Sequence, residues 1–133
     1  MQLLMLVYTD PTADPVTDPP EGEGWIERWV AENDAAGRRV VGERVLSMEQ
    51  ARVVRVRRGG TLVTDGPFAE TAEQLAGFDL LDCADMDEAV RVAADHPMAW
   101  YGRLELWPLG EVDPAELARA RTRGATAGTA AEG

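Results

Sequence analysis

The sequence is poor in the residues on which several common kinds of site depend. Cys83 is its only cysteine and His96 its only histidine. A single cysteine excludes an internal disulfide and gives no reason to expect an oxidising compartment, so we expect a cytoplasmic protein. With one histidine, and without further acidic residues at ligand spacing, we predict no metal site and no cofactor.

Basic residues and long apolar runs are also scarce. The 24 acidic and 13 basic residues give a net charge of -11, which would repel a phosphate backbone, so we expect no nucleic-acid partner. Seven arginines fall within residues 37–58, and we interpret them as the outer surface of a hairpin. The opening apolar run, Leu3–Tyr8, is too short to span a membrane, so we interpret it as a first strand and expect no membrane association.

What the sequence does contain suits one globular domain. A chain of 133 residues, 45% of them hydrophobic and 28% charged, can bury one core but is too short for two ordinary domains. We place that domain in residues 1–110. Residues 111–133 are rich in Ala, Gly, Thr and Arg without an apolar period, so we predict a flexible C-terminal tail.

Two stretches have the pattern of amphipathic helices. Residues 25–33 carry one apolar stripe and predict a first helix, which Gly37 ends. Asp85 predicts the capped start of a second helix, and His96-Pro97 predicts its end.

Six stretches are predicted as strands from their β-branched and aromatic content and from the turn residues between them. They are residues 3–8, 40–46, 51–57, 61–64, 77–83 and 103–108. We predict that 40–46 and 51–57 are adjacent strands, and that Gly59-Gly60 turns the chain back so that 61–64 pairs with 51–57. The order of elements predicts an α+β fold, a ferredoxin-like βαββαβ domain with an inserted β-hairpin.

The predicted fold leaves one face of its sheet uncovered. Two helices can cover only one face of a four-stranded sheet, yet the run from Leu3 to Tyr8 is apolar without alternation, so both of its faces should be buried. A second copy of the chain is the simplest cover. We therefore predict a homodimer with sheets face to face, in which each chain buries ~800 Å², the size of a specific interface.

One stretch of the chain resembles a known family signature. Residues 64–78 read TDGPFAETAEQLAGF. In this stretch we predict a turn at Asp65-Gly66-Pro67, followed by one helical turn that Gly77 ends. The pattern DGPFAET-x-EQL-x-GF is similar to that of the DGPF branch of the YCII-related (YciI-like) proteins. The resemblance implies a dimeric α+β barrel, in which two ferredoxin-like domains pack together.

This chain differs in two ways from what the resemblance implies. The resemblance implies a His–Asp pair with the histidine in or near the first helix, whereas this chain has no histidine before His96. An activity built on that pair therefore cannot be carried over. Asp79 stands where the resemblance implies an aromatic residue after Phe78, and we expect a carboxylate in mid-strand to lie either at an open edge or in a cleft.

Asp65, Glu70 and His96 are the candidate catalytic residues. Partial burial of Asp65 beside Phe68 would raise its pKa and suit it to acid–base chemistry, whereas the alternative is an ordinary turn in which it accepts backbone amides. Glu70 shares a helical side with Glu73, and the two acids with Asp65 would bind a cation or polarise a substrate amine, or else only solvate a helix start and favour its dipole. His96 would act as a general base, or else as His⁺ at the C-terminal end of the second helix.

The candidate substrate-binding residues are Tyr8, Asp10, Phe68 and Arg103. Arg103 would clamp an anionic ligand together with Tyr101, or both would only be rim residues paired with Asp82 or Glu105. The four tryptophans line a pocket on one interpretation, but their spacing is more typical of core and dimer packing.

These residues support two functions. The first is a small acid–base enzyme of the isomerase, cyclase or lyase type, which acts on a small organic molecule in a cleft beside the DGPF loop; ferredoxin-like muconolactone isomerases supply the analogy of fold. The alternative is a non-catalytic ligand-binding or regulatory protein. The resemblance implies an association with an extracytoplasmic-function sigma factor, and the acidic chain would suit a basic protein partner.

Overall fold

The computed structural model describes residues 1–13, 22–46, 48–66 and 73–110, together with 113, 115–116 and 118–119. Its elements are β1 (Gln2–Thr9), α1 (Trp25–Ala35), β2 (Arg39–Arg44), the short 3₁₀ helix η1 (Met48–Gln50), β3 (Arg52–Arg57), β4 (Gly60–Asp65), β5 (Leu75–Asp82), α2 (Met86–Ala94), α3 (Met98–Tyr101) and β6 (Gly102–Pro108). This order is the predicted βαββαβ arrangement with a β-hairpin inserted after the second strand, so the predicted α+β fold class is confirmed for the single chain.

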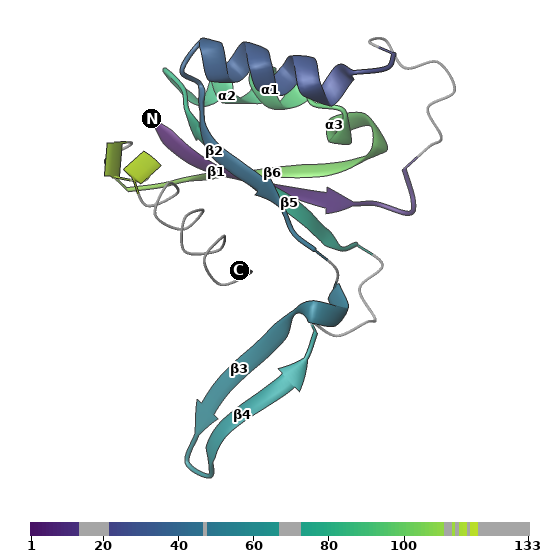
Figure 1. Ribbon diagram of the computed structural model, residues 1–133, viewed down its shortest axis with the longest axis vertical. Coiled ribbons are helices and arrows are strands. Elements are labelled where there is room, and N and C mark those ends of the chain that lie inside the picture. Colours follow the sequence, from purple (N-terminus) through teal and green to yellow (C-terminus); the bar gives the residue numbers. More distant parts are fainter. Residues whose placement is uncertain are drawn as a thin grey trace, which may run out of the picture.

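Four of the strands form an antiparallel main sheet in the order β2-β5-β1-β6. This is the strand order of a ferredoxin-like sheet, and it places β1 and β5 in the centre. The helices α1, α2 and α3 lie together on one face of the sheet (Figure 1). The helices therefore cover one face of the main sheet and leave the opposite face without a helical layer.

The central strand β1 is fully buried on one side only. Leu3, Met5 and Val7 are buried in the core that the helices share with the sheet. Leu4 and Leu6 point to the opposite face, where they are half-buried. The predicted central position of this strand is confirmed, and the cover expected on its second face does not come from the helices of the same chain.

Helix α1 is tied to the region of α2 by its two tryptophans. The indole N–H of Trp29 donates to the carbonyl of Val92 at 2.9 Å, and that of Trp25 donates to the carbonyl of Asp95 at 2.7 Å. Both indoles are buried with their N–H groups satisfied, as large amphipathic side chains in a core require. The predicted helix stripe is confirmed, and Gly37, with a φ of 73°, follows the helix as predicted.

Helix α2 begins with the N-terminal cap that the sequence predicts. Asp85 Oδ1 accepts a hydrogen bond from the backbone N–H of Glu88 at 2.8 Å. Glu88 Oε1 in turn accepts from the N–H of Ala84 at 3.1 Å, one residue before the cap. Two amide groups that the helix cannot satisfy internally are therefore satisfied by side chains.

Strands β3 and β4 form a separate two-stranded sheet that projects from the body, and we call Arg52–Asp65 the arm (Figure 1). Arg57 pairs with Gly60, so a two-residue turn joins the strands, and Gly60 has a φ of 117° that favours glycine. The predicted hairpin is confirmed, with its turn one residue earlier than predicted. The predicted adjacency of residues 40–46 and 51–57 is wrong: β2 pairs with β5, because the chain leaves the main sheet at η1.

Candidate functional site

A cavity of about 400 Å³ lies between α1 and the main sheet. Its walls are mostly apolar, and α1 contributes Ile26, Trp29 and Val30 to them. Two buried ionisable side chains, those of Asp79 and His96, also line it. An apolar cavity with a few polar groups is the usual form of a small-molecule site, so we take this cavity as the candidate site.

Asp79 reaches the cavity from the middle of β5. In the sheet it lies between Met5 of β1 and Gly42 of β2, on the face that α1 covers. Only 7% of the residue is exposed. Of the two positions expected for this mid-strand carboxylate, an open edge or a cleft, the structure shows the cleft.

Arg39 holds the Asp79 carboxylate with one nitrogen and uses its other two elsewhere. Its Nε donates to Asp79 Oδ1 at 2.7 Å, while Nη1 donates to Asp34 Oδ1 at 2.9 Å and Nη2 to the carbonyl of Gly42 at 3.1 Å. Burial raises the pKa of Asp79, and the opposing effect of Arg39 is smaller, so the net shift is upward. Burial lowers the pKa of Arg39, but its hydrogen bonds to Asp79 and Asp34 outweigh that effect, so the guanidinium stays protonated.

Gly42 makes room for this ion pair. A Cβ atom at position 42 would overlap Asp79 Oδ1 and would lie 2.9 Å from Arg39 Nη2. Neither group can move away without weakening the hydrogen bond between them. A glycine is therefore required where β2 passes the buried carboxylate, as is common where a strand is approached closely.

His96 lies between α2 and α3, and only 5% of it is exposed. Its Nδ1 accepts a hydrogen bond from the Met98 N–H at 2.9 Å, and its ring packs edge-on against Trp29 with ring centroids 4.6 Å apart. Burial, and to a lesser extent the charge of Arg39, lowers the pKa of His96 to about 4. The alternative of a charged His⁺ at the helix end is therefore wrong, because the buried ring is neutral at pH 7.

The neutral ring keeps one hydrogen-bond donor. Because Nδ1 is an acceptor, the ring proton resides on Nε2. Among the described residues, neither His96 Nε2 nor Asp79 Oδ2 has a hydrogen-bond partner, yet no buried side-chain nitrogen or oxygen there is left unsatisfied. Both atoms must therefore be open to solvent. Their residues line the same cavity, to which they bring one donor and one acceptor; His96 also borders a second hollow at the start of α1.

Three of the predicted substrate-binding residues lie together at the β6 edge of the main sheet. The guanidinium carbon of Arg103 lies 4.5 Å from the centre of the Tyr8 ring. Glu73 and Glu105 also hold this guanidinium, with Nε–Oε2 at 2.9 Å and Nη1–Oε2 at 2.6 Å. The predicted alternative of a surface pair with Glu105 is confirmed, so an anionic ligand would compete with two carboxylates for Arg103. Asp10 borders a hollow that Arg103 also lines.

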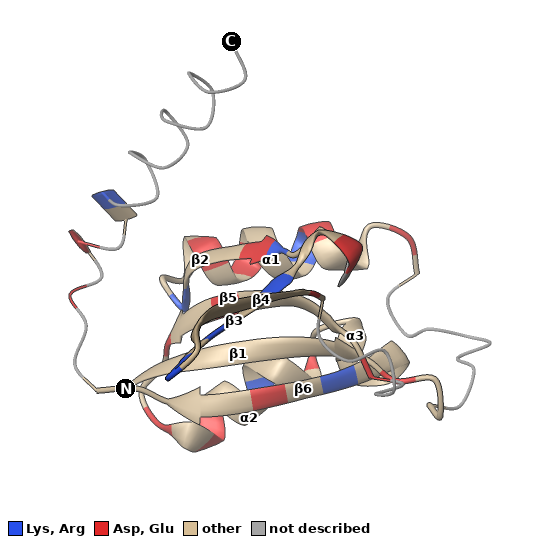
Figure 2. Ribbon diagram, turned by 90° about the horizontal axis from the view of Figure 1, so that it is seen from below, with Lys and Arg blue, Asp and Glu red and all other residues tan. Residues whose placement is uncertain are grey.

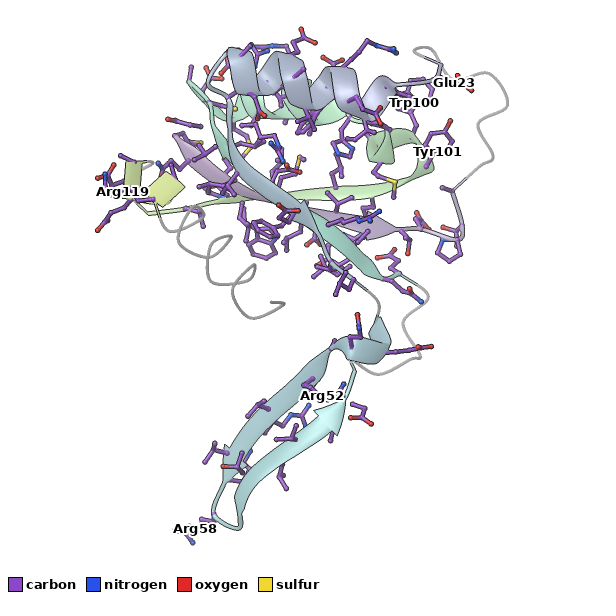
Figure 3. The ribbon with its side chains drawn as sticks, in the orientation of Figure 1. Glu23, Arg52, Arg58, Trp100, Tyr101 and Arg119 are labelled. Carbon is purple, nitrogen blue, oxygen red and sulfur yellow. The ribbon has the colours of Figure 1, made fainter. Side chains whose placement is uncertain are left out.

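The predicted catalytic residues do not meet in one place. Asp65 lies at the base of the arm, where its side chain is 88% exposed and pairs with Arg52, with Oδ1–Nε at 3.3 Å. The expected partial burial of Asp65 is therefore wrong, because the arm projects into solvent (Figure 3). Asp65 does not line the cavity that contains His96. Glu70 and Phe68 lie outside the described residues.

The four tryptophans divide into a buried pair and an exposed pair. Trp25 and Trp29 are buried as predicted, and Trp29 also lines the cavity. Trp100 and Trp107 are 46% and 55% exposed. Trp100, near the end of α3 (Figure 3), packs edge-on against Trp25 with ring centroids 6.2 Å apart.

Sequence reasoning did not single out Arg39 or Gly42. The available signals were a charged residue inside an apolar strand, which calls for a buried partner, and a glycine inside a strand, which indicates a close approach. Neither signal says which arginine or which strand supplies the partner, because that depends on the order of strands in the sheet.

Two other kinds of site are absent from the described residues. No group of three or more histidine, cysteine or acidic side chains lies close enough there to hold a metal ion. None of the helices in that part of the chain is both long and apolar enough to cross a lipid bilayer.

Among known protein families, the YCII-related domain matches residues 1–112 of this chain. This range includes every strand of the main sheet and the arm. An uncharacterized protein of Rhizobium meliloti (strain 1021) is 46% identical over 76 residues, which are 56% of this chain and 61% of that protein. The chain thus matches less than two thirds of the length of that relative.

The neutral state of His96 has a measurable consequence. Because it is the only histidine, one ring signal in an NMR titration reports it, and we expect a midpoint at a pH of about 4 rather than 6.5. Between these values the unfolded chain binds a proton that the folded chain does not. The free energy of unfolding should therefore fall by about 3 kcal/mol from this group as the pH is lowered from about 6.5 to about 4.

The matched control is His96→Gln, measured by urea denaturation at the same pH values. Asp79 has a raised pKa and contributes in the opposite direction, but it is present in both proteins, so the difference between them isolates the histidine. A ring signal that titrates near pH 6.5 would contradict the buried, neutral assignment.

Proposed function

This chain belongs to the YCII-related domain family, and from that premise we propose a function for the cavity under α1. It binds a small organic carbonyl compound and moves a proton within it, as an isomerase, cyclase or lyase does. The observation that carries the proposal is the pair of open polar atoms, Asp79 Oδ2 and His96 Nε2, in residues that line one largely apolar cavity. A proton acceptor and a hydrogen-bond donor are what proton transfer next to a carbonyl requires.

His96 has the role of hydrogen-bond donor in this proposal. Because Met98 occupies Nδ1, the neutral ring offers its Nε2–H to the carbonyl oxygen of a bound compound. A neutral imidazole stabilises the negative charge that develops on that oxygen, as in other enzymes with histidines of depressed pKa. The low pKa of His96 suits it to this role better than to the general-base role considered from the sequence.

Asp79 has the role of base. Arg39 fixes Oδ1 and leaves Oδ2 open, and the raised pKa makes the carboxylate more basic than a solvated aspartate. Oδ2 takes a proton from the carbon next to the carbonyl, and the C–H electron pair forms an enolate whose oxygen His96 holds. In a β,γ-unsaturated carbonyl compound, Asp79 then returns the proton to the γ-carbon as the double bond moves between the α- and β-carbons, so an isomer forms without loss of atoms.

The size of the cavity limits the ligand. A volume of about 400 Å³ is at the small end of the range for ligand pockets, about 300–1,000 Å³. The apolar walls from α1 would contact a hydrocarbon body, and the two open polar atoms would orient one carbonyl group. This cavity replaces the cleft beside the DGPF loop as the proposed site.

Proton transfer of this kind can be measured before the natural substrate is known. In D₂O, NMR over a panel of small ketones, enones and lactones should detect enzyme-dependent deuterium incorporation next to the carbonyl of at least one compound. Asp79→Asn should lower the rate about 100-fold or more, because a general base typically contributes that much. Asp34→Asn is the matched control and should leave the rate nearly unchanged, since Asp34 also binds Arg39 but does not line the cavity.

Three outcomes would redirect the assignment. Incorporation by Asp79→Asn at the wild-type rate, in a protein with an unchanged thermal melt, would show that Asp79 is not the base. A loss of deuterium incorporation in Asp65→Asn alone would assign the active site to the DGPF loop instead, with Asp65 and Glu70 as the remaining candidate residues. Binding of a compound without any incorporation would favour the non-catalytic ligand-binding alternative.

The uncovered face of the main sheet supports a second proposal, a homodimer. In the sheet register Leu4 lies between Leu80 and Trp107, and Leu6 lies between Phe78 and Glu105. These side chains are on the face opposite the helices, where Trp107 is 55% exposed and Leu80 is buried. An apolar sheet face without a helical layer is typical of a surface that packs against its own copy.

Leu6→Asp should dissociate this dimer, because it places an unpaired charge in the centre of the buried face. In sedimentation velocity at micromolar concentration, we expect the wild-type chain as a dimer and Leu6→Asp as a monomer. Val90→Asp is the matched control: Val90 is 52% exposed on α2, away from this face, and its variant should stay dimeric. A wild-type chain that is monomeric in this range would contradict the proposal.

The cytoplasmic location and the association with an extracytoplasmic-function sigma factor stay predictions, made from the cysteine content and from the family resemblance respectively.

A further inference from the structure

The arm exposes apolar side chains that a folded protein normally buries. Its strands pair only with each other, and it stands clear of the main sheet and the helices (Figure 1, Figure 3). Between 54% and 67% of each of four apolar residues is exposed, namely Val54, Val56, Leu62 and Val63. A two-stranded hairpin is at best marginally stable in water, so the arm requires a surface to pack against.

The register divides the arm into an apolar face and a basic face. Val54 lies opposite Val63, and Val56, two residues further on, is on the same face. Arg55 and Arg57 occupy the alternate positions of β3 and therefore lie on the other face. The valine face also carries the Arg52–Asp65 pair at its base, and the arginine face also carries Leu62, so the first face is mainly apolar and the second mainly basic.

We propose that the apolar face of the arm packs against the body of a second copy of this chain. The arm projects from the side of the main sheet that the helices leave uncovered (Figure 1), and the view from the arm end shows it in front of the sheet (Figure 2). A copy that docks on the uncovered face is therefore flanked by the arm. This inference rests on the sheet-to-sheet dimer of the proposed function, and two-fold symmetry gives each copy one arm around its partner.

Charge favours the same partner. The arm carries four arginines and one acidic residue, Asp65, whereas the whole chain has a net charge of -11. Acidic segments lie on α1 and α2, while β3 is basic (Figure 2). A basic arm is attracted to an acidic body and repelled by another arm. Because the arm extends away from its own body, the body of a second copy is the acidic surface that it reaches.

A basic hairpin is also a common nucleic-acid-binding element, but this arm lacks the other marks of one. Residues 52–65 contain no aromatic side chain on which a base would stack. The acidic remainder of the chain would repel a phosphate backbone. The valine side chains would also make no favourable contact with a phosphate backbone, whereas they can pack against the surface of a protein.

Hydrogen–deuterium exchange of the full chain tests the arm separately from the sheet. At concentrations where sedimentation shows a dimer, the amides of β3 and β4 should exchange at least about tenfold more slowly than at dilutions that give the monomer, because packing suppresses local opening of the hairpin. If the arm exchanges equally fast at both concentrations, although sedimentation shows a dimer at the higher one, the inference is overturned. The sheet interface would then still stand. A chain that is monomeric throughout would overturn both.

Variants of the two faces give the matching comparison. Val54→Thr combined with Val56→Thr keeps β-branched side chains but removes apolar surface, so the dimer dissociation constant should rise about tenfold or more. Leu62→Thr, on the arginine face, should leave it unchanged. An unchanged constant in the double variant would overturn the inference. So would binding of a fluorescent DNA duplex at physiological salt that Arg55→Thr abolishes, because the arm would then be a nucleic-acid element.

Discussion

The buried ion pair between Arg39 and Asp79 is the interaction on which the site depends. It joins β2 to β5, and because Arg39 also binds Asp34, it joins both strands to α1. A charge in an apolar layer is tolerated only when it is paired and hydrogen-bonded, so Asp79 can line the cavity only because Arg39 is held beside it. Gly42 leaves the room for both groups, and the charge of Arg39 helps to keep His96 neutral.

Such a pair is weak evidence for stabilisation, because apolar residues of similar volume often stabilise a core as well or better. Its position in a cavity wall gives it a different significance, since perturbed ionisable groups gather at functional sites. The same molecule leaves two apolar surfaces without cover from its helices, the second face of the main sheet and the valine face of the arm. A second copy would cover both, which ties the arm to the dimer rather than to a separate partner.

The sequence predicts the order of elements well because each signal is local. The stripe of α1, the cap at Asp85 and the turn after Arg57 are all decided within a few residues. The site was not predictable in the same way, because Arg39, Asp79 and His96 are far apart in the sequence and meet only when the strands take their order. Asp65 was misjudged for the same reason: its turn chemistry is local, but its burial depends on what packs against the arm.

A double-mutant cycle on Arg39 and Asp79, measured as the free energy of unfolding in urea, tests the central claim most directly. Arg39→Met alone should cost about 3–5 kcal/mol, because it leaves the buried Asp79 carboxylate without its partner, and Asp79→Leu should cost less, because Arg39 keeps its hydrogen bond to Asp34. The double variant should lose much less than the sum of the two, since no unpaired charge remains between these positions. Losses that simply add would show that the two residues do not depend on each other and would contradict the account.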